Sequence, residues 1–400
     1  MNKKILYAEA DYSQEEIDAV IDVLKNNRLT LMGGDKVKEL ELKVARIYNK
    51  NFGLMVNSGS SANLLALLSL RLKEGSKVIT PALTFSTTIF PIVQSNLVPL
   101  FVDVDEKTLQ VNVSRLKEIS LDNVSAICIP NLIGNIANWE DIYNYAKENK
   151  LKVIEDSADT IGYKYKTSLS NWSDISTTSF YASHIITGAG FGGMVSYSNS
   201  NDYEYGLTLR GWGRRSCLYG DTEDYERRFS SNIDEISYDD KYIFDEIGYN
   251  FLPSEISAAF ALVQLDKLDI KIKKRSINFN YLQNIFSSSS NFYVPKTYRN
   301  VETGWLAFPL IFKNKLAKKR NDIQIFLEKA GIQTRTIFTG NIMRQPVSKK
   351  FKWEKYGTFE VSDMVMESGI LLGIHNRQSQ KNLDYIAEKI FEAEKLLKDI

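Results

Sequence analysis

Short apolar segments alternate with segments of helical periodicity over the first half of the chain. The apolar segments of strand length are residues 52–56, 76–83, 98–105, 124–130 and 151–158. The helical patterns between them are residues 61–72, 86–96, 113–119 and 139–149. This alternation predicts a mostly parallel sheet with helices on both faces. Ligands of such sheets bind beyond the carboxyl ends of the strands, so we expect the functional site there.

The two ends of the chain carry helical patterns of their own. A capping box of Ser13 and Glu16 predicts a first helix with an apolar stripe of Ile17, Val20, Ile21 and Leu24. A long helical pattern from Pro253 towards Phe286 predicts a bridge between two domains. Beyond it, strands at 305–312 and 333–338 and helices at 321–331 and from Ser379 predict a small α+β domain.

The length of 400 residues agrees with two domains. We expect a large α/β domain over residues 1–265, which includes the N-terminal helices. The bridging helix and the small α+β C-terminal domain are expected over residues 266–400.

Charge and composition exclude several classes of function. The 50 basic and 49 acidic side chains nearly cancel, so we expect no nucleic-acid or membrane partner. The densest basic run, Lys271–Arg275, is expected to form a solvated helix face. No apolar stretch has the length of a signal peptide or a membrane span, which favours a cytoplasmic location. Two cysteines make no disulfide framework, and Cys128 is expected in a buried strand.

Small residues follow the first strand, in "VNSGSSANLLAL". Gly59, Ser60 and Ser61 lie where a strand ends and a helix begins. Free backbone N–H groups and hydroxyls at such a point suit a phosphate group. The alternative is a helix cap with nothing bound.

Carboxylates follow a later strand, in "VIEDSADTIG". Burial of the Asp156 and Asp159 carboxylates would cost free energy of desolvation unless a cation pairs with them. A protonated pyridine nitrogen is one such cation. A metal ion is a rival, although no histidine or cysteine lies nearby, and capping of the next element is the structural alternative. We therefore predict no metal site.

His184 precedes a glycine-rich run in "SFYASHIITGAGFGG". The run is no dinucleotide fingerprint, because that motif follows a strand directly and opens a helix. We expect it to form a tight turn that leads into a strand at "MVSYS". A histidine on its own is more often structural than catalytic.

Several motifs taken together resemble the fold type I sugar aminotransferases, which depend on pyridoxal phosphate (PLP). The motifs are "NSGSSANLLAL", "PALTFSTT", "FVDVD", "IEDSAD", "SFYASHIIT", "GYNFLPSEISAAFALVQL" and "TRTIFTGN". The resemblance implies an aspartate-aminotransferase-like fold. His184 falls on the lysine that forms the Schiff base with PLP in that family. Histidine there resembles the 3-dehydratase branch, which removes the 3-hydroxyl of nucleotide-linked 4-keto-6-deoxyhexoses.

The resemblance also implies roles for other residues. His184 would move protons between the cofactor and the sugar. The residues implied to hold the phosphate are Gly59, Ser60, Ser61 and Ser179. Phe85 would stack on the ring, Asp156 would pair with the ring nitrogen, and Asp159 would lie near the ring hydroxyl. Asn250 would reach the cofactor of a partner subunit, so a homodimer is implied. Asn341 and Arg344, in "TGNIMRQP", are candidates for contact with the nucleotide sugar.

The dehydratase branch contains subgroups that differ in cofactor. "DDKYIFDEIGYNFLPSEI" and "FTGNIMRQP" resemble a CDP-linked subgroup that adds a [2Fe-2S] cluster and a reductase. Such a cluster needs four cysteines, but this chain has Ser157 and Ala158 in "EDSAD" and only Cys217 in "GRRSCLYGD". We expect no iron–sulfur cluster and no reductase. The GDP-linked subgroup is then the other candidate, and the nucleotide stays open.

The implied cycle uses PLP and its amine form, pyridoxamine phosphate (PMP), with L-glutamate as amino donor. An imidazole cannot form the stable imine of a lysine, but it can accept and donate a proton near neutral pH. Two alternatives remain open. One is an ordinary nucleotide-sugar aminotransferase, and the other is a non-catalytic protein that binds a nucleotide sugar.

Overall fold

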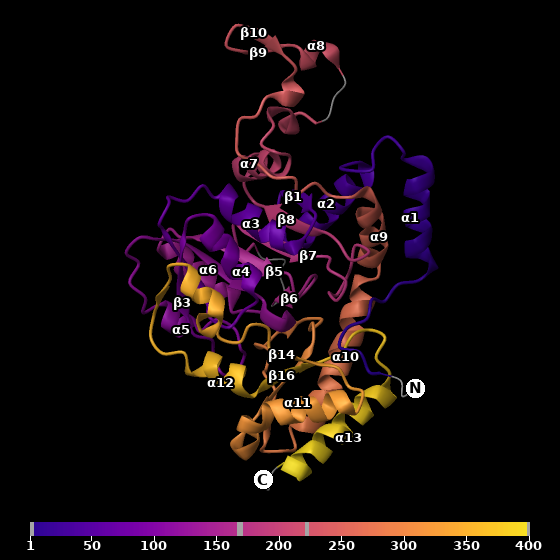
Figure 1. Cartoon of the computed structure of the whole chain (residues 1–400), viewed down its shortest axis with the longest axis vertical. Helices are drawn as coiled ribbons and strands as arrows, with labels where there is room; N and C mark the ends of the chain where they lie inside the picture. The colour runs from indigo at the N-terminus through magenta and orange to yellow at the C-terminus, as the bar shows by residue number, and fades with distance from the viewer. Residues whose placement is uncertain (1–3, 166–170, 221–223, 398–400) are drawn as a thin grey trace.

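An eight-stranded sheet forms the centre of the molecule (Figure 1). The computed structural model describes residues 4–165, 171–220 and 224–397. The strands of the large sheet are β1 (Phe52–Val56), β2 (Lys77–Pro81), β3 (Val98–Val102), β4 (Val124–Pro130), β5 (Lys152–Ser157), β7 (Ile175–Ser179), β8 (Gly193–Tyr197) and β15 (Glu354–Lys355). Their order is β1-β8-β7-β5-β4-β2-β3-β15. Only β8 runs antiparallel to its neighbours, so the mostly parallel sheet is confirmed.

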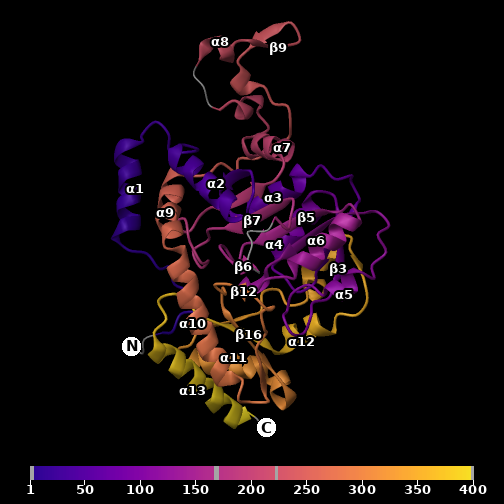
Figure 2. The same ribbon diagram turned by 180° about the vertical axis from the view of Figure 1, so that it is seen from behind.

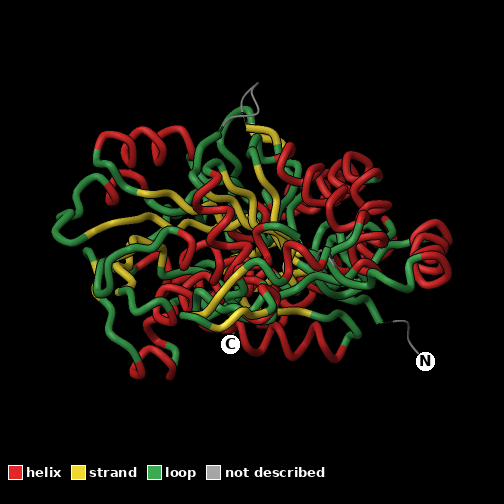
Figure 3. The backbone as a smooth tube through the Cα atoms, turned by 90° about the horizontal axis from the view of Figure 1, so that it is seen from above, coloured by secondary structure: helices red, strands yellow, loops and turns green. Residues whose placement is uncertain are grey.

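Helices pack against both faces of this sheet, and from above the strands near the middle of the molecule have helices on both sides (Figure 3). The helices of this domain that follow the strands are α3 (Gly59–Ser69), α4 (Ser86–Gln94), α5 (Val113–Leu116), α6 (Trp139–Glu148) and α7 (Ser200–Arg210). Neighbouring residues of β2 show why both faces are apolar. Val78 packs in one core with Leu65 of α3, and Ile79 packs in the opposite core with Trp139 of α6. Burial on both faces explains the unbroken apolar runs of the sequence.

A second, antiparallel sheet forms the C-terminal part. Its strands, in spatial order, are β11 (Phe292–Tyr293), β13 (Phe308–Phe312), β16 (Gly369–Leu372) and β14 (Thr334–Thr336). The helices around it are α11 (Arg320–Lys329), α12 (Glu360–Ser368) and α13 (Gln380–Leu397). The α+β character agrees with expectation, but the sequence did not reveal α12 or β16. The boundary at residues 265 and 266 stays a prediction.

The bridge between the two sheets is a pair of helices, α9 (Glu255–Asp266) and α10 (Leu268–Phe286), which Figure 2 shows end to end. The expected continuous helix is therefore interrupted at Lys267, whose ψ of 5° is not helical. A solvated basic face on α10 was also expected, and this is wrong for two residues. Lys271 and Arg275 are only 4% and 3% exposed. Each has partners inside the protein: Lys271 Nζ lies 3.0 Å from Asp11 Oδ2, and Arg275 donates to backbone carbonyl groups.

The N-terminal helix α1 (Gln14–Asn26) stands apart from the sheets and lies against α9 (Figure 1). Its predicted apolar stripe does not face the core: Ile17, Ile21 and Leu24 are all exposed. Two side chains of this helix are buried, Val23 and Glu16. Glu16 accepts hydrogen bonds from Ser13 N at 2.9 Å and Gln264 Nε2 at 2.6 Å. Val23 and the polar contacts of Glu16 therefore attach this helix, and most of its predicted apolar stripe is left exposed. The helix that follows is α2 (Asp35–Ile47).

An arm also projects from the large domain (Figure 1, top). It carries α8 (Tyr225–Arg228) and a hairpin of β9 (Ser231–Ile233) and β10 (Ile236–Tyr238). A last two-stranded pair joins β6 (Lys164–Tyr165) to β12 (Val301–Glu302). No helix in the described ranges is long and apolar enough to span a bilayer.

We predict that Glu16→Gln loosens α1. Burial alone would raise the pKa of Glu16, but hydrogen bonds from Ser13, Lys267 and Gln264 lower it to about 2. Its folded pKa lies below the ordinary value, so the charged form supports the fold at neutral pH, and this support fades as the pH falls from 4.5 towards 2. Loss of this charge should favour local opening by about 1–3 kcal/mol.

Hydrogen exchange at neutral pH measures this effect. Amides of residues 14–26 should exchange faster in Glu16→Gln, and amides of the large sheet should not. Glu15→Gln is the matched control, because Glu15 also pairs with Lys267 but its side chain is 70% exposed. Equal exchange in the two variants would contradict the role of Glu16.

Candidate active site

A large cavity lies between the two sheets, beyond the carboxyl ends of β5 and β7, and has a volume of about 1150 Å³. Its wall includes residues 7–10, the start of α3, residues 85–90 at the start of α4, residues 156–159 at the end of β5, the loop after β7, and residues 335–347. The predicted site residues among its lining are Gly59, Ser60, Phe85, Asp156, Asp159, Ser179 and His184. The structure therefore brings together seven predicted residues from four separate stretches of the sequence.

The start of α3 forms one end of the cavity. Ser58 caps the helix, because its Oγ accepts from Ser61 N at 3.1 Å. The Ser61 hydroxyl lies 3.0 Å from Ser58 Oγ, and Ser61 is not part of the lining. A Cβ on Gly59 would lie 2.6 Å from Ser179 Cβ, so only glycine lets this helix start approach β7. Backbone N–H groups of Gly59 and Ser60 are thereby left at the cavity wall, as an anion requires.

Asp156 is the penultimate residue of β5 and is 4% exposed. Its Oδ2 accepts from Asn63 Nδ2 and Thr88 Oγ1, both at 2.8 Å, and its Oδ1 accepts from Ala158 N at 3.1 Å. All three donors are neutral. Burial raises the pKa of this carboxyl group, and the donors counteract the shift. The site holds a carboxylate ready for a cation from the cavity.

Asp159 and Phe85 lie on other parts of the wall. Asp159 Oδ2 accepts from Ile133 N at 2.8 Å. Burial raises the pKa of Asp159 to about 7, and the nearby Asp156 adds to the shift. Phe85, immediately before α4, is 50% exposed and meets Phe338 edge to face at 5.8 Å. An apolar ring exposed inside a cavity offers a surface on which a flat ligand can stack.

His184 lies in the loop after β7. Its Nδ1 is 3.3 Å from the carbonyl oxygen of Ser179. A carbonyl only accepts, so this contact places the proton on Nδ1 and leaves Nε2 as a free base. Burial lowers the pKa of His184 to about 4, and Arg275 contributes to the shift. The imidazole is therefore neutral at physiological pH and can accept a proton.

The glycine-rich run after His184 forms the expected tight turn and leads into β8. Gly190 and Gly192 have backbone φ angles of +97° and +111°, which residues with a side chain rarely adopt. A Cβ on Gly188 would lie 2.3 Å from the Phe191 carbonyl oxygen. These glycines let the loop fold back beside Asn57, whose carbonyl accepts from Gly192 N.

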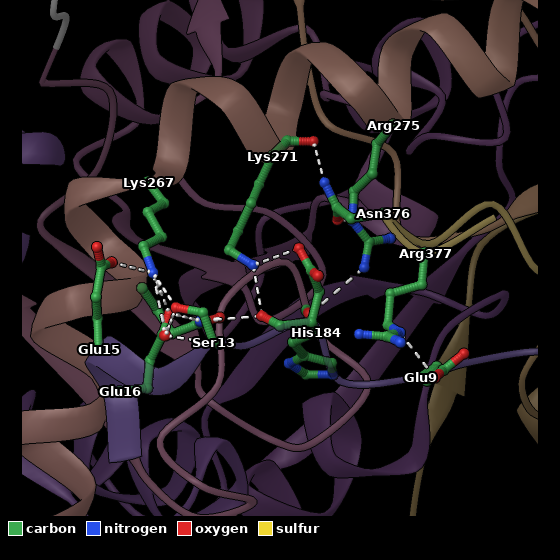
Figure 4. Close-up of polar contacts among 12 residues, drawn as sticks. Glu9, Ser13, Glu15, Glu16, His184, Lys267, Lys271, Arg275, Asn376 and Arg377 are labelled. Atoms are coloured by element: carbon green, nitrogen blue, oxygen red, sulfur yellow. Dashed lines mark hydrogen bonds and ion pairs between the residues drawn. The ribbon is translucent and has the colours of Figure 1, made fainter. Parts of the chain in front are cut away.

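Arg275 holds the main chain of His184 from the α10 side (Figure 4). Its Nη2 lies 3.5 Å from the His184 carbonyl oxygen, and its Nη1 donates to the Leu306 carbonyl oxygen at 2.9 Å. Burial lowers the pKa of Arg275 to about 10, so it remains charged at neutral pH. The guanidinium group thus connects the histidine loop to the C-terminal domain.

Besides Ser61, three predicted residues lie outside this cavity. Asn250 is exposed and pairs with Gly211 at the base of the arm. Asn341 is buried, and its Nδ2 donates to Asp363 Oδ1 at 2.7 Å. Arg344 forms an ion pair with the same Asp363. Their neighbours Ile342 and Gln345 do line the cavity.

Sequence reasoning missed four polar residues of the site. Asn63 and Thr88 position Asp156, and Tyr7 and Arg335 line the cavity. Asn63 left a signal, since it is a polar residue inside the apolar helix "ANLLALL". Tyr7 left none, because its place depends on contacts with residues 331–333 at the other end of the chain.

These residues fit a PLP-type cofactor. Asp156 is a buried carboxylate, and no cation among the described residues forms an ion pair with it; a protonated ring nitrogen would supply that charge. The helix start at Gly59 suits the phosphate, and Phe85 suits the ring. Within the described ranges no group of three or more metal-ligating side chains occurs.

Comparison with known proteins identifies the family. The sequence model of the DegT/DnrJ/EryC1/StrS aminotransferase family matches residues 10–391. The chain belongs to this family. The resemblance seen in the sequence is thus confirmed, and the protein is a PLP-dependent enzyme of the sugar aminotransferase family.

Two of three similar proteins carry dehydratase names. Lipopolysaccharide biosynthesis protein RfbH of Salmonella typhimurium is 33% identical over 85% of this chain and 80% of its own. The dTDP-4-dehydro-2,6-dideoxy-D-glucose 3-dehydratase of Saccharopolyspora spinosa is 33% identical over 94% of this chain and 84% of its own. The structure of the E. coli GDP-4-keto-6-deoxy-D-mannose-3-dehydratase with bound hydrated PLP superposes with a TM-score of 0.86. It is 28% identical over 97% of this chain and all of that one.

We predict that the imidazole of His184 stays neutral well below pH 6.5. NMR of the imidazoles in the cofactor-free protein should show no protonation of His184 between about pH 8 and about pH 5, because burial disfavours its charged form. His184→Asn assigns the signal, since His375 is the chain's other histidine. A midpoint at or above 6.5 would contradict the neutral base.

Proposed function

We propose that the enzyme removes the 3-hydroxyl of a nucleotide-linked 4-keto-6-deoxyhexose, with L-glutamate as amino donor. The observation that carries this proposal is the cavity wall: His184 lines it, and no lysine among the described residues does. The dehydratase names of two relatives, at 33% and 28% identity, support it. The product would be a 4-keto-3,6-dideoxy sugar nucleotide.

The chemistry would divide between the cofactor and the chain. The bound cofactor supplies an electron sink for a carbon that loses its proton. Asp156 would hold the proton on the ring nitrogen, which keeps that sink effective. His184 Nε2 would take the proton from the carbon and return it to the leaving hydroxyl. General acid–base help of this kind contributes about 10² to 10⁴ in rate.

The remaining site residues would hold the cofactor. Gly59, Ser60, Ser61 and Ser179 are proposed for the phosphate, Phe85 for stacking on the ring, and Asp159 for the ring hydroxyl. Asn341 and Arg344 remain proposals for the nucleotide sugar, and the choice among CDP, GDP and dTDP stays open.

We also propose that no iron–sulfur cluster or reductase takes part. The two cysteines of the chain are too few for a Cys₄ cluster. Ser157, in "EDSAD", faces away from Asp156, because its hydroxyl donates to Glu155 Oε1 at 2.7 Å. Glutamate then supplies the reducing equivalents through PMP.

A homodimer is proposed from uncovered apolar surface. Ile17, Ile21 and Leu24 of α1 are exposed, and the arm exposes Phe244 and Ile247 as well. A second copy of the chain would cover such surface. Asn250, at the base of the arm, would then serve the site of the partner.

The reaction products test the proposed function. Incubation with L-glutamate and CDP-, GDP- or dTDP-linked 4-keto-6-deoxyhexoses should give one 2-oxoglutarate and one ammonia for each sugar converted. Mass spectrometry should show a sugar that has lost the 3-hydroxyl oxygen and has gained no nitrogen. A stable amino sugar would identify an aminotransferase instead, as in the GDP-perosamine synthase of E. coli O157:H7, a 31% identical relative.

Substitution of His184 tests the proton transfer. His184→Asn should bind PMP and lower the dehydration rate by about 10² to 10⁴. His375→Asn is the matched control, because His375 is buried outside the cavity and contacts the Leu6 carbonyl oxygen. It should keep dehydration near the level of the unchanged enzyme. Near-normal turnover of His184→Asn would assign the proton transfer to another group, with Tyr181 and Asp159 as the next candidates.

A further inference from the structure

Arg335 is the one arginine or lysine among the described residues that line the cavity. The other ionisable side chains of the wall are Glu9, Asp156 and Asp159, two tyrosines, and the neutral His184. L-glutamate and a nucleotide sugar are both anions. An anion that binds in a cavity with three carboxyl groups on its wall needs a cationic side chain to offset their repulsion, and this protomer supplies Arg335.

The guanidinium group of Arg335 is positioned but not neutralised. Its Nη1 donates to the Thr334 carbonyl oxygen at 2.7 Å, and its carbon Cζ lies 5.2 Å from the centre of the Tyr7 ring. No carboxylate of the described residues forms an ion pair with it, whereas Glu9 is paired with Arg377 at 2.8 Å. Its remaining N–H donors are thus available to a planar carboxylate, which arginine binds through two parallel hydrogen bonds.

The surroundings of Arg335 are rigid. Its backbone lies opposite Leu371 in the pairing of β14 with β16, and Leu371 is fully buried. Tyr7 is held beside it, because Tyr7 N donates to Gln333 Oε1 at 3.1 Å. Burial and the charge of Asp159 raise the pKa of Tyr7, so its ring stays a neutral platform for the cation.

The position of Arg335 favours the amino donor over the pyrophosphate of the sugar nucleotide. Arg335 Cζ lies 5.2 Å from the centre of the Tyr7 ring, and the charge of Asp159 raises the pKa of the same tyrosine, so Arg335 and Asp159 both lie near Tyr7 on the cavity wall. The α-carboxylate of an amino acid is bonded to the carbon that carries the reacting amine, so it must lie beside the reacting atoms. The pyrophosphate is separated from the C4 ketone by the whole sugar ring.

We propose that Arg335 binds the α-carboxylate of the amino donor. This inference rests on the proposed function, in which L-glutamate converts PLP to PMP. Dehydratases and aminotransferases share this half-reaction. The role of Arg335 is tested in this half-reaction, whereas the dehydratase proposal is tested on the sugar product. The two proposals can therefore fail independently.

The test measures kcat/KM of the PLP-to-PMP half-reaction by its spectral change, with three donors. L-glutamate has both carboxylates, L-glutamine lacks the γ-carboxylate, and L-isoglutamine lacks the α-carboxylate. Arg335→Gln should lower kcat/KM about 10- to 100-fold for glutamate and glutamine, as expected for loss of a charged hydrogen-bonded pair. It should change kcat/KM for isoglutamine less than about 3-fold. Arg335→Lys should recover part of the loss, because it keeps the charge but not the planar fork.

Arg299→Gln is the matched control, because Arg299 is exposed in the C-terminal domain and lies outside the cavity. It should behave as the unchanged enzyme, and circular dichroism should show the same fold for all variants. Equal losses for all three donors would overturn the assignment to the α-carboxylate. A selective loss for isoglutamine and glutamate would move Arg335 to the γ-carboxylate. Unchanged donor kinetics with weaker calorimetric binding of GDP or CDP would assign Arg335 to the nucleotide and overturn the proposal.

Discussion

The carboxylate of Asp156 is buried at the carboxyl end of β5, and neutral donors alone hold it. A buried charge without a counter-charge is costly, so a fold retains one where a ligand completes the pair. The donors come from different elements: Asn63 from α3, Thr88 from α4 and Ala158 from the loop after β5. Positioning this one carboxylate therefore fixes the two helices whose first turns form the cavity wall. We propose that the ring nitrogen of the family's cofactor supplies the missing charge.

The second constraint is the identity of the residue at position 184. Family members with lysine there bind the cofactor covalently, but His184 is a neutral imidazole whose Nδ1 is engaged by the Ser179 carbonyl oxygen. Only Nε2 remains for chemistry. Arg275 fixes the main chain of the same residue from α10, and its buried charge also disfavours a protonated imidazole. A free base beside an electron sink suits elimination, which explains why we connect this substitution with loss of the 3-hydroxyl.

The sequence allowed prediction of the features that depend on local pattern. Apolar runs such as residues 124–130 predicted the parallel strands. Small or acidic residues after the strands predicted a site at the strand ends. Features set by contacts between distant segments were not predictable. Lys271 and Arg275 looked like solvent-exposed residues, because their partners, Asp11 and the carbonyl group of Leu306, are remote in sequence. Arg335 was missed in the same way, since its importance depends on a cavity that only the folded chain creates.

We propose that the cofactor is held without a covalent bond, because His184 falls where the resemblance places the Schiff-base lysine and no described lysine lines the cavity. Borohydride reduction of the PLP-loaded enzyme, followed by intact-mass measurement, tests this directly. The chain mass should stay unchanged after denaturation, and the cofactor should be recovered free. A stable gain equal to a reduced phosphopyridoxyl group, on a lysine whose loss abolishes activity, would contradict the claim.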